Sequence, residues 1–489
     1  MIYLLSWAYT ASLGVLCLYG IHRLAHLVSL WRGKRWEDQL ATDTPKVLIQ
    51  LPLFNERAVA ARVIASAAAI DWPRESLLIQ VLDDSTDDTS ALVDEEVRRW
   101  RDRGVRIQVL RRTDRQGFKA GALGAGLEQS DAPFVAVFDA DFLPRPDFLR
   151  RTMAAFDDPG VGMVQGRWHH ENRDESLFTR AQATLLDGHF VVEHQARYGV
   201  GHCFNFNGTA GIWRRAAIME GGGWNGDTLT EDLDLSYRSQ LAGWRFVYAW
   251  NVTVPSELPV DAAAFLAQQA RWARGSVQVL RKLAMPLARS RFPLRKKMEA
   301  FSHLLGNGGQ PFLLLLALTL PFVVQNRSEL LGPMHFVAFF LCTVAVLSFY
   351  ETSQRLVGRP FVKRSVDILA AMALGIGMCL RQSKAVYLGL FGDRGVFERT
   401  PKRGDQSNVP YKARQSSSGW IELAFGMVYF ASVVRALAMG AWTSVPFLLL
   451  FAWGFFWVGG RALMESRVLS VPKTSKPGSP LDSKAKAAS

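Results

Sequence analysis

Residues 77–89 read LLIQVLDDSTDDT, a short apolar run followed at once by two aspartates. A continuous apolar run of this length predicts a strand that is buried on both faces, as in a parallel sheet. The stretch that follows, DDTSALVDEEVRRWRDRG (87–104), has apolar residues at helix-like spacing. A strand, a polar turn and a helix in this order predict the first part of a βαβ unit.

The same alternation recurs on both sides of this stretch. A helix-like segment, ERAVAARVIASAAAI (56–70), precedes it. Three further apolar runs are KVLIQL (46–51), RIQVL (106–110) and FVAVF (134–138). Strands that alternate with helices predict a sheet covered on both faces. The fold class is therefore α/β, with a Rossmann-like half inside a polar block of roughly residues 37–297.

Outside this block the chain is strongly apolar. Residues 2–21 form an uncharged run long enough to cross a bilayer of roughly 30 Å as a retained helical anchor. Further apolar runs are 311–324, which the uncharged stretch from Phe301 extends upstream, and 333–350, 420–438 and 441–460. A further segment, 366–392, is apolar but contains Asp367, Arg381 and Lys384. We therefore expect five crossings, with 366–392 as an interfacial or re-entrant segment.

The basic residues orient these helices. Arginines and lysines follow the first and third runs, at Arg23, Arg32, Lys34, Arg35, Arg359, Lys363 and Arg364. By the positive-inside rule these flanks, and with them the polar block, face the cytoplasm. The net charge of +13 gathers beside apolar segments, notably in RSRFPLRKK (289–297), which favours anionic lipid over nucleic acid as a partner. The four cysteines have no metal-ligand spacing.

Acidic residues follow two of the predicted strands. Because ligands of open α/β sheets bind beyond the carboxyl ends of the strands, Asp83 and Asp84, and then Asp139 and Asp141, are candidate site residues. Two aspartates one residue apart suit Mg²⁺ or Mn²⁺, although turn chemistry is an alternative. No GxGxxG or GxxxxGK[ST] motif follows any of these predicted strands, which argues against a dinucleotide oxidoreductase and a P-loop NTPase.

Three further motifs offer both a structural and a functional interpretation. Lys119 lies just before a predicted helix in RQGFKAGALGAGL (115–127), where a phosphate could bind, or it is a solvated lysine. In TLTEDLDLSYR (228–238), Thr230 is a candidate N-cap, and the acids after it either start a helix or supply a catalytic carboxylate. QQARWARG (268–275) places Gln268, Arg271 and Trp272 on one face of a helix. That face could bind sugar and diphosphate, or belong to an interfacial helix.

The order of these motifs resembles the D, DxD, TED, QxxRW series of the membrane-embedded family 2 glycosyltransferases, the group that contains cellulose and hyaluronan synthases. The strings that look most like plant cellulose-synthase-like mannan and glucan synthases are LPLFNER (51–57), QVLDDSTDDT (80–89), GFKAGAL (117–123), FDADFLP (138–144), FNGTAGIWR (206–214) and LTEDLDLSYR (229–238). FERTPKRG (397–404) is similar to their gating loop. The resemblance implies a GT-A glycosyltransferase domain inserted between transmembrane helices.

The resemblance also implies a role for each motif. Asp84, with Asp83 and Glu56, would hold the uridine or guanosine part of the donor, and Lys119 would approach its phosphates. Asp139 and Asp141 would support Mg²⁺ or Mn²⁺. Asp232 would be the general base, while Glu231 and Asp234 start the helix. Gln268, Arg271 and Trp272, with Glu231 beside them, would hold the acceptor and brace the diphosphate. Phe397, Arg399, Thr400 and Lys402 would close over the donor, with Arg399 standing where cellulose synthases usually have valine.

The implied division of the chain has seven parts. They are an N-terminal anchor (1–31), a cytoplasmic GT-A domain (37–260), basic interfacial helices with QxxRW (261–298), two transmembrane helices (299–352), the interfacial segment with the gating loop (353–418), two more transmembrane helices (419–463) and a disordered basic tail (464–489).

The implied activity is an inverting, metal-dependent transfer from UDP-glucose or GDP-mannose to a growing β-linked polysaccharide, processive and coupled to translocation. One alternative is the transfer of single sugars to a membrane lipid. Another is a non-catalytic nucleotide-sensing or transport protein, in which the acids would be eroded; all four motifs are intact. The implied partners are the donor, a polysaccharide or lipid acceptor, the bilayer and possible export subunits, with no nucleic acid. The implied location is a bacterial inner membrane or a eukaryotic Golgi membrane.

Overall fold

The computed structural model describes residues 2–326, 333–393, 395 and 419–470. A seven-stranded sheet in the order β3-β2-β1-β4-β6-β5-β7 forms the centre of the polar block. Its strands are β1 (Val47–Leu53), β2 (Leu77–Asp83), β3 (Ile107–Leu110), β4 (Phe134–Val137), β5 (Val161–His170), β6 (Gly211–Arg214) and β7 (Arg245–Ser256).

The first four strands form the expected parallel half of the sheet. Strand β1 pairs in parallel with β2 and β4, and β2 pairs in parallel with β3. Strand β6 is antiparallel to both β4 and β5, whereas β5 and β7 are parallel to each other. The sheet is therefore mixed, and the change of direction at β6 brings the second half of the domain beside the carboxyl end of β4.

Helices cover the sheet, which explains the continuous apolar strands. Helices α2 (Arg57–Ala68), α3 (Thr89–Asp102) and α4 (Phe118–Glu128) connect the parallel strands, as the sequence predicted. Leu48, Val81 and Val135 are fully buried in the resulting core. Strands that face helices on both sides need apolar side chains in both directions, so the period-two alternation of a one-sided sheet is absent from β1, β2 and β4.

Shorter elements complete the sheet domain. They are η1 (Arg74–Ser76), α5 (Phe148–Thr152), η2 (Met153–Asp157), η3 (Arg173–Glu175), α6 (Leu177–Asp187), the π-helical turn η4 (Gly188–His194), α7 (Gln195–Gly199), α8 (Arg215–Glu220) and α9 (Glu231–Leu241). Helix α6, the turn η4 and helix α7 follow one another without a break.

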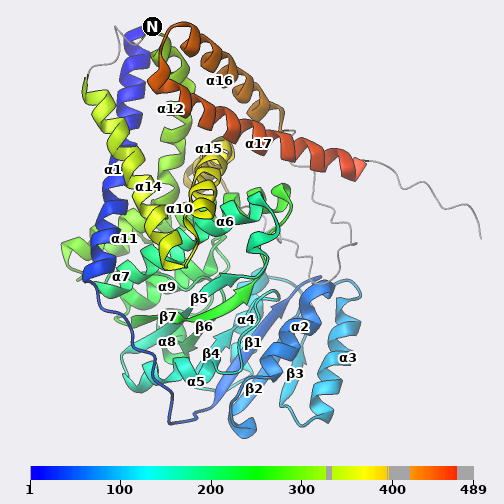
Figure 1. The fold of residues 1–489 in the computed structure, drawn as a ribbon. Helices are drawn as coiled ribbons and strands as arrows, with labels where there is room; N and C mark the ends of the chain where they lie inside the picture. Colours follow the sequence, from blue (N-terminus) through cyan, green and yellow to red (C-terminus); the bar gives the residue numbers. More distant parts are fainter. Residues whose placement is uncertain (1, 327–332, 394, 396–418, 471–489) are drawn as a thin grey trace, which may run out of the picture.

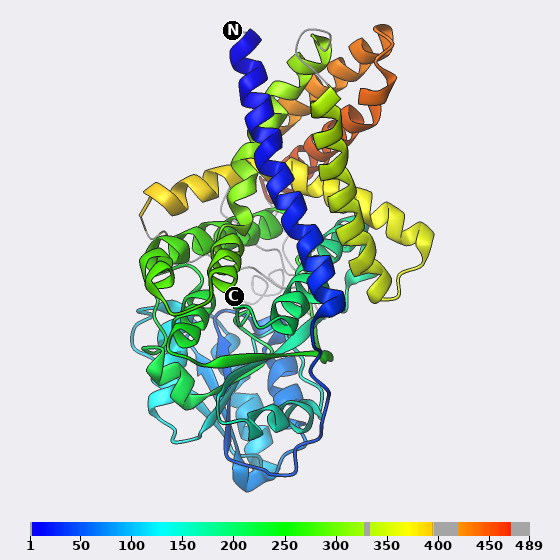
Figure 2. The ribbon, with the colours of Figure 1, turned by 90° about the vertical axis from the view of Figure 1, so that its left-hand side faces the viewer.

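Five helices of the described chain are long and apolar enough to cross a membrane, as expected from the sequence. They lie in α1 (Ile2–Arg32), η5 (Gly306–Gly309) with α12 (Gln310–Gln325), α14 (Pro333–Leu356), α16 (Trp420–Ala438), and η6 (Trp442–Ser444) with α17 (Val445–Ser470). Figure 1 shows these helices above the sheet domain, with α10 (Ala262–Arg289) and α11 (Leu294–Leu304) between the two parts. Helix α1 runs along the helical part down to the sheet domain (Figure 2).

The apolar segment 366–392 lies within one continuous helix, α15 (Phe361–Phe391), which is not among these five. It runs crosswise to α1 in Figure 2. Two of its charged residues have partners: Arg381 donates to Glu422 on α16 at 2.7 Å, and the fully buried Asp367 accepts from Arg180 at 2.8 Å. These partners offset the cost of placing the two charges in an otherwise apolar helix.

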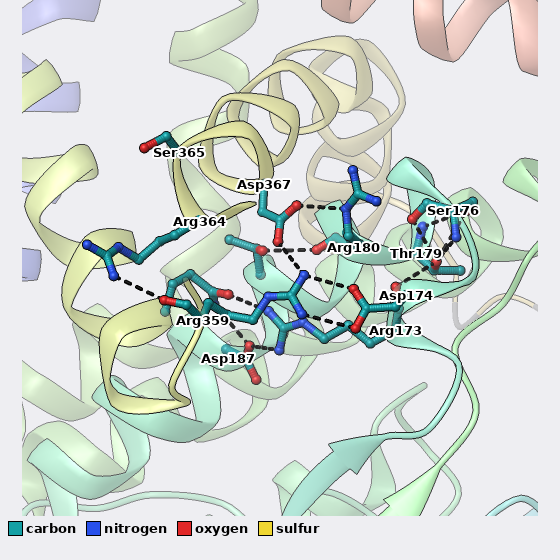
Figure 3. A network of polar contacts seen from close by, with 12 residues as sticks. Arg173, Asp174, Ser176, Thr179, Arg180, Asp187, Arg359, Arg364, Ser365 and Asp367 are labelled. Carbon is teal, nitrogen blue, oxygen red and sulfur yellow. Dashed lines mark hydrogen bonds and ion pairs between the residues drawn. The ribbon is translucent and has the colours of Figure 1, made fainter. Parts of the chain in front are cut away.

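A network of ion pairs joins α15 to the sheet domain (Figure 3). Besides Arg180 on α6, Asp367 accepts from Arg359 at 3.0 Å, and Arg359 also donates to Asp174 at 2.8 and 3.0 Å. Arg173 of η3 donates to Asp187 at 2.5 Å. The network therefore connects η3 and α6 with the segment between α14 and α15.

Two sequence predictions concern the end of the chain. Helix α17 continues to Ser470, within the stretch from residue 464 that the sequence predicts as a disordered tail. The gating-loop residues Phe397, Arg399, Thr400 and Lys402, and residues 471–489, lie outside the described residues.

Candidate functional site

A cavity of about 160 Å³ lies at the carboxyl ends of β1, β2 and β4. It collects most of the residues that the sequence singled out, from six separate motifs. The predicted residues that line it are Glu56, Asp84, Lys119, Asp139, Asp141, Glu231, Asp232, Gln268, Arg271 and Trp272. These residues are up to 216 positions apart in the sequence. They meet at one site because the carboxyl ends of the parallel strands lie at the same edge of the sheet, and because α9 and α10 return to this edge.

Asp83 is not among the residues that line this cavity, and its contact with the donor stays a prediction. Its side chain is buried, accepts a hydrogen bond from Arg111 Nε at 2.9 Å, and accepts another from the Ser85 backbone N–H at 3.0 Å. Asp83 is the last residue of β2, and neighbouring side chains of a strand point to opposite sides. Asp84 therefore reaches the cavity, whereas Asp83 holds the loop that follows the strand.

The end of the cavity beside Asp84 contains arginines that the sequence interpretation missed. Asp84 accepts from Arg112 Nε at 3.1 Å, and Arg112 also donates to the backbone oxygens of Gln116 and Phe118, each at 2.9 Å. The Arg115 guanidinium lies over the Phe54 ring, 3.2 Å from its centroid. Arg111 and Arg112 directly follow β3, so the strand-end rule that found the aspartates would also have found them.

Lys119 and Asp139 form the centre of the cavity. Lys119 lies in the first turn of α4, one residue inside the helix rather than before it. Its Nζ donates to the Asp139 carboxylate and, at 2.8 Å, to the Gly208 backbone oxygen. Burial opposes a charged lysine, but Asp139 and Glu231 outweigh it and raise the pKa of Lys119. A fixed positive charge therefore lies beside the DxD pair.

Asp139 and Asp141 offer only oxygen ligands. Both line the cavity at the end of β4, where the Asp139 backbone N–H donates to Thr209 Oγ1 at 2.9 Å. Carboxylate oxygens with open space beside them fit a hard divalent cation such as Mg²⁺ or Mn²⁺, and not a soft metal that needs thiolate. The residues present therefore fit the predicted type of cation.

Asp232 lies in the first turn of α9, and its position is fixed from two sides. Its Oδ1 accepts from the Leu233 backbone N–H at 2.8 Å. Its Oδ2 faces Gly208, where an added Cβ would lie 2.9 Å away and where φ is +82°. Thr230 occupies the N-cap position as predicted, but its side chain makes no capping hydrogen bond and packs against Gly275 instead.

The surroundings of Asp232 prepare it to accept a proton. Burial and the neighbouring Glu231 charge raise the pKa of Asp232 to about 7, despite the opposing influence of Lys119 and Arg271. A carboxylate with this pKa is a competent general base at neutral pH. Asp234, by contrast, is fully buried and paired with Arg238 at 2.8 Å and Lys282 at 2.9 Å, which is a structural position.

A second cavity, of about 320 Å³, adjoins the first. The two share a wall made of Trp168, Asn207, Thr230, Asp232 and Trp272. From this wall the second cavity extends to residues of α1 and of the segment before α12, including Tyr19, His22, Arg23 and Asn307. Asp232 therefore stands between a cavity at the sheet edge and a cavity that leads toward the membrane helices.

The sequence interpretation assigned no role to Trp168 or Asn207. Trp168 lies 6.4 Å from Trp272 and 4.7 Å from Phe190 between ring centroids, and with them forms an aromatic side of the second cavity. Asn207 lies in the string FNGTAGIWR, which carries the family resemblance. The string did not indicate that Asn207 itself lines the site. Neither residue follows a strand of the parallel half, so the strand-end rule does not reach them.

A Rossmann-like half without phosphate-binding glycine loops, an acidic pair at a strand end and a carboxylate between two cavities are the features expected of a GT-A glycosyltransferase. The family model described as "Glycosyltransferase like family 2" matches residues 45–275. The chain is 35% identical over 417 residues to glucomannan 4-beta-mannosyltransferase 1 of Oryza sativa subsp. japonica, with 79% of each chain covered. It belongs to the family 2 glycosyltransferases, in the group of these plant enzymes.

Two further comparisons agree with this assignment. Glucomannan 4-beta-mannosyltransferase 2 of Arabidopsis thaliana is 45% identical over 260 residues, a match that spans 52% of this chain and about half, 49%, of that relative. The solved structure of the mannosyltransferase PcManGT from Pyrobaculum calidifontis, in complex with GDP-Man and Mn²⁺, aligns with a TM-score of 0.53 at 21% identity and covers 77% of this chain and 99% of that one. The predicted family, GT-A fold and enzyme class are thereby confirmed.

Proposed function

We propose that this enzyme is an inverting β-mannosyltransferase that uses GDP-mannose and a divalent cation to extend a β-linked mannan at a membrane. The observation that supports it best is Asp232, a carboxyl with a pKa of about 7 in the wall shared by two cavities. The names of the relatives favour mannose as the sugar, and the GDP-Man bound to PcManGT favours guanosine as the donor base.

In this proposal the first cavity is the donor site. Glu56 and Asp84 lie at the end that would receive the guanosine, beside the arginines that follow β3. Asp139 and Asp141 would hold Mg²⁺ or Mn²⁺, which when bound offsets the negative charge of the diphosphate. The ammonium of Lys119 lies beside the same pair and would approach the phosphates.

The reaction is a single displacement. An acceptor hydroxyl oxygen attacks the anomeric carbon of the donor, a new C–O bond forms, and the bond to the diphosphate oxygen breaks on the opposite face. Asp232 takes the hydroxyl proton, and the electron pair of the broken bond leaves with GDP. The Arg271 guanidinium interacts electrostatically with Asp232 and Asp139. It would balance the negative charge of the leaving diphosphate. Attack from the opposite face converts an α-linked donor into a β-linked product.

The second cavity would hold the acceptor. Trp272 and Trp168 supply aromatic faces on which sugar rings can stack, and Gln268 lines the adjoining donor site. Because the cavity extends to Tyr19 and His22 on α1, a growing chain would leave the site toward the membrane helices. This exit path supports processive synthesis with translocation over single transfers to a lipid.

The membrane arrangement belongs to the same proposal. The catalytic domain would face the cytoplasm, in a bacterial inner membrane or a eukaryotic Golgi membrane, with α15 as an interfacial helix and the division of the chain otherwise as expected from the sequence. Phe397, Arg399, Thr400 and Lys402 would close over the donor, and accessory subunits could assist export.

A donor screen tests the proposal. The purified protein with Mn²⁺ receives radiolabelled GDP-mannose, UDP-glucose or UDP-galactose, and the products are sized and subjected to linkage analysis. We expect a β-linked polymer from GDP-mannose and its loss with EDTA. A single mannose on extracted lipid would refute processive synthesis. Polymer formed from UDP-glucose alone would refute GDP-mannose as the donor.

A further inference from the structure

The wall of the second cavity contains a π-helical turn, η4, between α6 and α7. In an α-helix, residues five positions apart point about 140° away from each other. The i→i+5 hydrogen bonding of a π-helix brings such residues onto one side, and π-turns are rare and frequent at functional sites. Here His189 and His194 lie with their rings 4.2 Å apart between centroids. The π-helical turn thus places two imidazoles together, with His189 in the lining of the cavity and His194 buried behind it.

The two imidazoles hold the side-chain amide of Asn207 from both ends. His194 Nε2 lies 2.8 Å from Asn207 Oδ1 and 3.1 Å from the Asn205 backbone oxygen. Asn207 Nδ2 lies 3.1 Å from His189 Nε2, and His189 Nδ1 lies 3.2 Å from a carboxylate oxygen of Glu193. Four side chains therefore form one continuous row of hydrogen bonds.

Only one arrangement of protons satisfies this row. Both partners of His194 Nε2 are acceptors, so Nε2 must carry the proton and donate. The Asn207 oxygen then accepts, its Nδ2 donates to His189, and His189 Nε2 must be bare. His189 Nδ1 in turn carries the proton and donates to the Glu193 carboxylate. Each tautomer and the orientation of the amide are thereby fixed, and a flipped amide would set donor against donor and acceptor against acceptor.

The charges around the row agree with these protonation states. Burial, His189 and Arg197 lower the pKa of His194 well below its ordinary value, so His194 is neutral. Burial alone would favour a protonated Glu193, but Arg197 and the His189 hydrogen bond outweigh it and hold the pKa of Glu193 well below its ordinary value. The row therefore begins at an ionised carboxylate and ends at a neutral imidazole.

Asn207 lies where this row meets the reaction. It lines both cavities together with Asp232, and its backbone N–H donates to Gln165 Oε1 at 3.0 Å, which fixes the main chain as well. The Nδ2 group carries a second N–H in addition to the one donated to His189. We propose that Asn207 is an acceptor-binding residue, and that His189 and His194 are positioning residues that make its amide donate this N–H to a hydroxyl of the acceptor sugar.

The inference rests on the proposed function, because it assumes a sugar acceptor. Measurements of the acceptor KM test it. Initial rates with GDP-mannose and a soluble β-manno-oligosaccharide acceptor are measured for the wild type, His189→Ala, His189→Gln and Asn207→Leu. We expect His189→Ala and Asn207→Leu each to raise the acceptor KM about tenfold, the loss of one oriented hydrogen bond, with the KM of GDP-mannose unchanged. His189→Gln can accept from Asn207 and donate to Glu193, so it should recover most of the acceptor affinity.

Two further measurements separate positioning from structural damage. The double variant His189→Ala/Asn207→Leu should raise the acceptor KM no more than Asn207→Leu alone, because His189 acts only through Asn207. His169→Ala, which removes an exposed histidine of β5, is the matched control and should keep the wild-type acceptor KM.

The inference would be overturned by an unchanged acceptor KM in His189→Ala, by an acceptor KM in His189→Gln as high as in the alanine variant, or by additive effects in the double variant. A simultaneous loss of GDP-mannose affinity would assign His189 a structural role and would also overturn it. If the wild type transfers sugar only from another nucleotide sugar, the proposed donor fails, and the same acceptor measurements with that donor still decide the role of Asn207.

Discussion

Replacing Asp232 with asparagine should abolish activity and at the same time stabilise the folded protein at neutral and alkaline pH. The folded-state pKa of Asp232 is raised from 3.8 to about 7, chiefly by burial and by Glu231. The unfolded carboxyl is ionised above its ordinary pKa, whereas the folded one keeps its proton up to about pH 7. The destabilising effect of Asp232 therefore grows as the pH rises from about 4 and is complete above about pH 7.

The size of the effect follows from the shift. About three pKa units correspond to about 4 kcal/mol of folding free energy at pH 8. This figure is an upper limit, because Asp232 is only half-buried at the cavity wall and cavity water screens its charge. The asparagine variant does not carry this cost. Its unfolding temperature should exceed that of the wild type by several degrees at pH 8 and match it near pH 4.

Thermal unfolding in detergent across this pH range, together with transfer rates, measures both effects. The wild-type rate should rise through about pH 7 to a plateau, and the variant should lose about 10²-fold or more. Asp234→Asn is the control: it breaks a buried ion pair with Arg238 and Lys282 and should lower stability. A variant with wild-type turnover would refute Asp232 as the base, and a stability difference independent of pH would refute its raised pKa.

Three further changes have defined outcomes. Gly208→Ala should lower kcat at least tenfold with little change in expression, because its Cβ would lie 2.9 Å from Asp232 Oδ2 at a φ of +82°; an unchanged kcat would contradict the close approach. Lys119→Met removes a charge that lowers the pKa of Asp232, so the rising limb of the pH–rate profile should move to higher pH, and a profile at its original position would count against this coupling. Arg180→Ala leaves the buried Asp367 with fewer partners and should lower the unfolding temperature, whereas an unchanged value would show that this ion pair adds no stability.

The parallel half of the fold was predictable because each of its strands can be recognised from its own short run of residues. Strands β1, β2 and β4 are buried on both faces, so each appears in the sequence as a short apolar run. The acids after these runs could be placed at one edge of the sheet without knowledge of any long-range contact. The antiparallel insertion of β6 was not predicted, since four residues of GIWR carry no pattern that fixes a pairing direction.

The site residues that lie in sequence motifs were predictable. The residues that only tertiary packing brings together were not. Asp83 and Asp84 are chemically equivalent in the sequence, and only the pleat of β2 decides which of them reaches the cavity. The row through His189 and Asn207 depends on a π-turn, which arises from one extra residue in a helix and has no recognisable sequence signal. Asn207 and His189 are also 18 positions apart, so no spacing rule brings them together.

The ion-pair network around Asp367 has a mechanical consequence. Tilting the sheet domain away from α15 at this edge would take Arg180 away from the fully buried Asp367 carboxylate and Asp174 away from Arg359, and breaking a buried ion pair costs about 3–5 kcal/mol. That is comparable to a large share of the stability of an ordinary domain. The contact between the sheet domain and α15 is therefore rigid, so in the proposed function a movement that advances the polymer by one sugar would come from parts smaller than the domain itself.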